Sequence, residues 1–134
     1  MNINMESQTP TTSVILEGTD THGEEAIRLY ESTGREAFPW QQNLISQILS
    51  VGDDGLWTHG RFGYAVPRQN GKNEIAAMRE YYALENGERV LHTAHRTTTS
   101  HTAWERLCSL LDASGYKCAQ HVHSKDNYPD EILY

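Results

Sequence analysis

One stretch constrains the fold of this chain more than any other: residues 64–74, with the sequence YAVPRQNGKNE. A short apolar run leads into a polar loop that ends in Gly71-Lys72, and a helical pattern follows at once. A strand, a loop ending in Gly-Lys and a helix are the context that a phosphate-binding loop needs. Gly71 lets the backbone approach a phosphate, and Lys72 reaches the outer phosphates as a point charge. The stretch therefore predicts a phosphate-binding loop.

The loop departs from the pattern G-x-x-x-x-G-K-[ST] at two positions. Val66 stands where the first Gly belongs, and Asn73 stands where a Ser or Thr hydroxyl would bind Mg²⁺. Asn73 either offers a carbonyl oxygen to Mg²⁺ or leaves a water in that place. Both alternatives stay open, and in either case full catalytic activity is less expected than with a Ser or Thr at this position.

Three segments resemble one family in the right order. Residues 66–74 resemble the deviant Walker A loop of tailed-bacteriophage terminase large subunits, in which Arg and Gln precede Gly-Lys and the first Gly is often missing. Residues 37–41, AFPWQ, resemble that family's adenine motif, an aromatic residue followed by Gln. Residues 93–99, TAHRTTT, resemble the segment after its next strand. Together the matches extend from about Phe38 to Leu111, which makes them more specific than any one alone.

The resemblance implies ATP and Mg²⁺ as cofactors and gives roles to named residues. Gln41 would read adenine, because an amide both donates and accepts. Arg68 is either a solvated loop residue or an arginine finger in cis beside the transferred phosphate, and we favour the second. Arg68 and Lys72 are the expected catalytic residues, and Asn73 is the expected metal ligand. The expected nucleotide-binding residues are Gln41, Pro67, Arg68, Gln69, Asn70, Gly71, Lys72 and Asn73.

The predicted fold class is α/β, a partial P-loop NTPase of the ASCE type with parallel strands flanked by helices. Helices are expected at 24–32, 39–51, 73–84 and 102–113, a Thr-rich loop at 96–100, and strands at 62–66, 89–94, 117–123 and from 131. Asp130-Glu131 is not a Walker B motif, because Asn-Tyr-Pro precedes it instead of an apolar strand. The chain therefore resembles the front part of a motor, truncated before the Walker B strand. We expect it alone to hydrolyse ATP poorly or not at all.

The net charge of −7 is unevenly distributed, since residues 1–36 carry −5 of it. A hydrophobic content of 37% and a mean hydropathy of −0.66 indicate that part of the chain is unpacked. We expect residues 1–35 to form an acidic and largely flexible arm with one short helix, and residues 36–134 to form the ATPase portion. This distribution is not the basic footprint of a nucleic-acid-binding domain.

Two cysteines do not make a disulfide framework, and neither a signal peptide nor a membrane-spanning apolar run is recognisable. The expected location is the host cytoplasm, at the procapsid portal during packaging. The resembling family packages double-stranded DNA with ATP and cuts it with a separate endonuclease domain. The resemblance implies a portal protein, a small terminase subunit and homo-oligomerisation as partners. Two alternatives remain: a fragment of another helicase-like P-loop motor, and a non-catalytic binding module that retains the fold.

Overall fold

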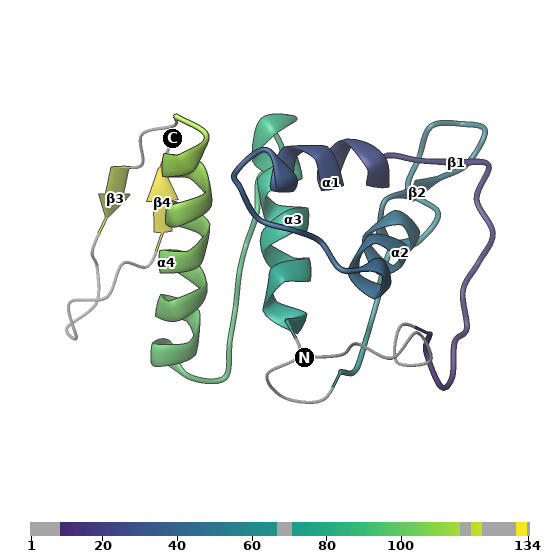
Figure 1. The fold of residues 1–134 in the computed structure, drawn as a ribbon, viewed down its shortest axis with the longest axis horizontal. Helices are drawn as coiled ribbons and strands as arrows, with labels where there is room; N and C mark the ends of the chain where they lie inside the picture. The colour runs from purple at the N-terminus through teal and green to yellow at the C-terminus, as the bar shows by residue number, and fades with distance from the viewer. Residues whose placement is uncertain (1–8, 67–70, 116–118, 122–130, 134) are drawn as a thin grey trace.

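The computed structural model describes residues 9–66, 71–115, 119–121 and 131–133 (Figure 1). Helices dominate these residues, and the strands are short. The elements in chain order are β1 (Asp20–Thr21), α1 (Gly23–Glu31), α2 (Pro39–Ile48), β2 (Ser50–Val51), α3 (Lys72–Glu85), α4 (Thr97–Ala113), β3 (Ala119–His121) and β4 (Glu131–Leu133). The helices predicted from periodicity are therefore confirmed, with shifted ends.

One hydrophobic core joins residues of α1, α2 and α3 with Leu110 of α4. Each helix turns an apolar stripe inward, as the 3.6-residue period predicts. The largest apolar side chains fully enclosed in this core are Ile45, Leu49, Ile75, Met78 and Leu110. The face predicted for α3, Ile75, Met78 and Tyr82, is buried. A smaller cluster of Tyr81, Leu107 and Leu111 holds α4 against α3.

Helices α3 and α4 stand side by side and run in the same direction, as Figure 1 shows. Residues 86–96 return along them in the opposite direction. His92 on this return segment contacts Glu80 of α3, which ties the segment to the helix. Leu91 beside it is 88% exposed, so no neighbouring element covers it within the described residues.

Residues 18–22 are bound to the segment after α2. Strand β1 pairs antiparallel with β2, with Asp20 opposite Val51 and Thr21 opposite Ser50. Two backbone hydrogen bonds extend the pairing on both sides: the Thr19 N–H donates to the Val51 carbonyl oxygen at 2.9 Å, and the His22 N–H donates to the Leu49 carbonyl oxygen at 3.1 Å. The short helix expected in the N-terminal arm is present as α1, and Ala26 and Tyr30 on it are buried in the shared core. Residues of α1 therefore pack with residues on the other side of the predicted boundary at residue 35.

Several predicted element bounds are wrong. The helix expected to reach Val51 ends at Ile48, because Ser50 and Val51 pair with β1 instead. The segment expected as a Thr-rich loop at 96–100 is instead the start of α4. Arg96 is extended and immediately precedes the helix, and its carbonyl oxygen accepts the Ser100 N–H at 3.1 Å. Residues 62–66 and 89–94 are not strands, because a strand needs a neighbouring ladder and these segments pair with none in the described chain.

The strands expected around residues 117–123 and from residue 131 are present in part, as β3 and β4. They pair with each other antiparallel, with Gln120 opposite Ile132. Among the residues that the structure describes, both strand pairs are antiparallel. The parallel sheet of a partial P-loop fold therefore stays a prediction.

Candidate functional site

The candidate site begins at the N-terminus of α3. Gly71 immediately precedes the helix with a φ of 83°, in the left-handed region that favours glycine. Lys72, the first residue of the helix, is exposed. The N–H groups in the first turn of a helix lack partners within the helix, and the positive end of the helix dipole lies there. This end of α3 can therefore attract an anion close to Lys72.

The side chain of Gln41, from α2, meets Gly71. Its Nε2 donates a hydrogen bond to the Gly71 carbonyl oxygen at 3.0 Å, although the two residues are 30 positions apart in the chain. Its Oε1 accepts the Phe38 N–H at 2.9 Å, which satisfies a backbone group at the start of α2. A Cβ on Gly71 would lie 2.8 Å from Gln41 Nε2 and 3.9 Å from Cζ2 of Trp40. The structure therefore packs the segment of the predicted adenine motif against the end of the predicted phosphate loop.

Four residues of the predicted loop lie outside the described residues: Pro67, Arg68, Gln69 and Asn70. Their predicted roles in nucleotide binding stay predictions. The segment that leads to them is anchored, because the Tyr64 hydroxyl donates to the Lys72 carbonyl at 3.1 Å.

Asn73, the predicted metal ligand, is exposed on the first turn of α3. Within the described ranges, no three His, Cys, Asp or Glu side chains gather as a group that could hold a metal ion. The role of Asn73 toward Mg²⁺ stays a prediction. No helix within the described portion has the length and apolar character needed to cross a membrane.

A hydrogen-bonded network beside the α3 terminus links three helices. Glu74 of α3 accepts a hydrogen bond from the Tyr30 hydroxyl of α1 at 2.6 Å and forms an ion pair with Arg106 Nε of α4 at 2.9 Å. Both ionic side chains are less than one-third exposed, so solvent screens the pair incompletely. Sequence reasoning assigned no role to Glu74 or Arg106, because nothing local in the sequence pairs residues 32 positions apart.

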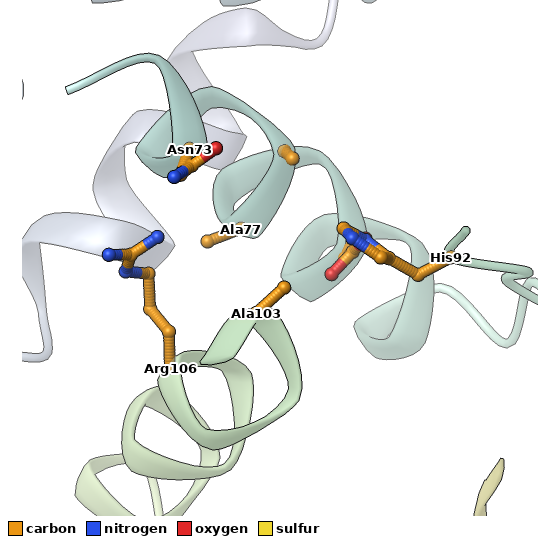
Figure 2. A pocket seen from close by; sticks show the side chains of 7 residues that line it. Asn73, Ala77, His92, Ala103 and Arg106 are labelled. Carbon is orange, nitrogen blue, oxygen red and sulfur yellow. The ribbon is translucent and has the colours of Figure 1, made fainter. Parts of the chain in front are cut away.

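A shallow hollow lies between α3 and α4, next to this network (Figure 2). Asn73 and Ala77 on α3 face Ala103 and Arg106 on α4, and His92 stands at the other end beside Glu80. Small alanines let the helices approach, so the volume is only about 20 Å³. That volume holds roughly one water molecule, whereas ligand pockets span hundreds of Å³. The hollow is therefore not a nucleotide pocket.

We expect the protein to lose stability in alkali because of the Tyr30 hydroxyl. Burial is the larger cause, and together with the hydrogen bond to Glu74 it raises the pKa of Tyr30 well above its ordinary value of 10. The folded protein therefore keeps this proton above pH 10, where the unfolded chain releases it. The associated stability is complete below pH 10 and is lost as the pH rises above it. The expected slope is at most about 1.4 kcal/mol per pH unit.

Urea unfolding of wild type and Tyr30→Phe between pH 7 and 11 measures this effect. We expect a constant difference between the two proteins up to about pH 9 and a shallower alkaline decline for Tyr30→Phe. Burial also raises the pKa of Tyr82, with Glu25 and Glu88 adding to it, so a smaller decline should persist in the variant. Parallel alkaline slopes in the two proteins would contradict the assignment to Tyr30.

Comparison of the chain with protein-family models, with curated proteins and with solved structures finds no match.

Proposed function

We propose that this chain binds ATP as the front part of a phage terminase large subunit, the motor that packages viral DNA into procapsids. One observation carries the proposal: the hydrogen bond between Gln41 and Gly71 joins two of the three segments on which the family resemblance rests. Their separation of 30 residues means that local structure alone does not bring them together. A shared site would bring two such segments together, and the contact supports the proposal in this way.

The arrangement of α3, the return segment and α4 also supports the proposal. The two helices run in the same direction and residues 86–96 run opposite to both, as a strand does between the helices of an α/β unit (Figure 1). In the proposed site, Lys72 binds the outer phosphates and Arg68 lies beside the transferred phosphate. The proposed site also binds Mg²⁺, with Asn73 as its ligand. The wider terminase proposal adds the location at the procapsid portal and three partners: double-stranded DNA, the portal protein and the small terminase subunit.

Replacing Lys72 by alanine is expected to weaken nucleotide binding at least about tenfold. A charged donor to a phosphate contributes roughly 1.5–3 kcal/mol, and about 1.4 kcal/mol corresponds to a factor of ten. The measurement is isothermal titration of a nonhydrolysable ATP analogue in the presence of Mg²⁺. Arg89→Ala is the matched control, because Arg89 is also an exposed cationic residue but lies on the return segment. We expect Arg89→Ala to bind like wild type.

Two results contradict the proposal: an absence of binding to wild type, and equal binding to wild type and Lys72→Ala. The first result favours the alternative of a non-catalytic module that retains the fold. One observation favours that alternative, namely that Gln41, predicted to read adenine, is 2% exposed and makes protein hydrogen bonds through both ends of its amide.

A further inference from the structure

The amide of Gln41 is enclosed by the protein. Only 2% of the residue is exposed, and both its nitrogen and its oxygen have partners. The orientation of the amide is self-consistent: reversing it would set oxygen against the Gly71 carbonyl and the NH₂ group against the Phe38 N–H. Gln41 therefore has a defined structural task in this chain.

An enclosed amide cannot recognise a nucleobase. Reading adenine requires the amide to present its donor and acceptor together to the edge of the base. In this structure the donor faces the Gly71 carbonyl and the acceptor faces the backbone of α2. Trp40, next to it, is partly buried and packs against the main core. The pair is therefore built into the protein and does not offer a base-reading surface.

The contact fixes the position from which α3 starts. Gly71 has a left-handed backbone, and its carbonyl oxygen is held by Gln41 and also accepts the Glu74 N–H at 3.2 Å. Lys72 follows directly, so the direction in which its side chain leaves the helix depends on the backbone at Gly71. Loss of the Gln41 donor would leave this carbonyl with the weaker of its two bonds and free the turn to shift.

We infer that Gln41 is a positioning residue for the triphosphate site, and that the site accepts nucleoside triphosphates with little selection of the base. The inference rests on the proposed nucleotide binding and specifies its substrate class. It assigns recognition to the phosphate groups, through Lys72 and the first turn of α3, and assigns Gln41 to the geometry of that turn.

Competition in the wild-type protein tests base selection without any substitution. ATP, GTP and inorganic tripolyphosphate each displace a fluorescent nonhydrolysable ATP analogue in the presence of Mg²⁺. We expect the dissociation constants of ATP and GTP to agree within about threefold, because Gln41, the predicted base reader, has both ends of its amide bonded to the protein. A preference for ATP of about tenfold or more would overturn the inference while leaving nucleotide binding in place.

The variant Gln41→Leu tests the positioning role. It removes the donor to Gly71 while keeping a side chain of similar size. We expect binding of ATP, GTP and tripolyphosphate to weaken by the same factor, roughly tenfold. Gln42→Leu is the matched control: the Gln42 amide donates to the Ala37 carbonyl at 2.8 Å and does not contact Gly71. Its affinities should equal those of wild type.

The possible outcomes separate the inference from the function on which it rests. Loss of ATP binding with unchanged tripolyphosphate binding in Gln41→Leu identifies a base reader and overturns the positioning role. Failure of all three ligands to bind wild type refutes the proposed function, and the inference falls with it. Circular dichroism shows whether Gln41→Leu is folded. If it is unfolded, the variant Gly71→Ala is used in its place, because an added Cβ at Gly71 would displace the same amide. The competition experiment on the wild-type protein decides base selection in either case.

Discussion

Replacing Ile45 by alanine is expected to lower the free energy of unfolding by about 2–5 kcal/mol. Ile45 is completely buried at the centre of the core shared by α1, α2 and α3. The substitution removes three carbon atoms and leaves a cavity that the surrounding helices fill only in part. Since domains of this size are stabilised by roughly 5–15 kcal/mol, the effect is a large fraction of the total.

Chemical denaturation followed by circular dichroism measures the effect, and Ile48→Ala is its matched control. Ile48 lies on the same helix and loses the same atoms, but it is only partly buried at the margin of the core. We expect its loss of stability to be clearly smaller, because less apolar surface returns to water in the unfolded state. Equal losses at the two positions would show that the core is not centred where the structure has it.

Gly23→Ala is expected to destabilise the protein by about 1–3 kcal/mol, although alanine is the better helix former. Gly23 is the first residue of α1 and is buried against α2. A Cβ at this position would lie 2.5 Å from Cα of Ser46 and 2.8 Å from its Cβ. Because Ser46 Cα belongs to the backbone of a packed helix, relief of the clash requires α1 and α2 to separate.

Gly63→Ala provides the control for Gly23→Ala. An added Cβ at Gly63 meets nothing within 4 Å, and this glycine is not among those with positive φ. The substitution should leave stability unchanged or raise it by up to about 1 kcal/mol, because alanine reduces the freedom of the unfolded chain. Thermal unfolding of both variants gives the comparison. A stabilised Gly23→Ala protein would mean that α1 and α2 do not touch at this glycine.

The helices were predictable because their signals are local. The apolar spacing of Ile75, Met78 and Tyr82 repeats with the helical period, and all three are buried. Pro39 suits the first turn of a helix, and α2 begins at this residue. Gly71 was recognised as a turn before a helix, and its positive φ agrees. These features depend only on neighbours within a few positions.

The strands were less predictable because a strand depends on a partner. Residues 62–66 and 89–94 have strand-like compositions, yet they pair with no strand in the described chain. Asp20 and Thr21, in contrast, gave no strand signal and became β1 by pairing with β2. Strand-like composition therefore did not decide which segments pair, because pairing depends on which segments lie side by side in the folded chain.

The sequence by itself determined roughly where the helices lie, which of their faces are apolar, and that a turn at Gly71 precedes α3. Only the tertiary structure decided that Gln41 is buried against Gly71, and that Glu74 joins Tyr30 to Arg106. The physical reason is range: helical periodicity is set by hydrogen bonds four residues apart, whereas these side-chain contacts bridge 30 to 44 positions. Such contacts require segments far apart in the chain to lie side by side, as α1, α2 and α3 do around Ile45 and Met78.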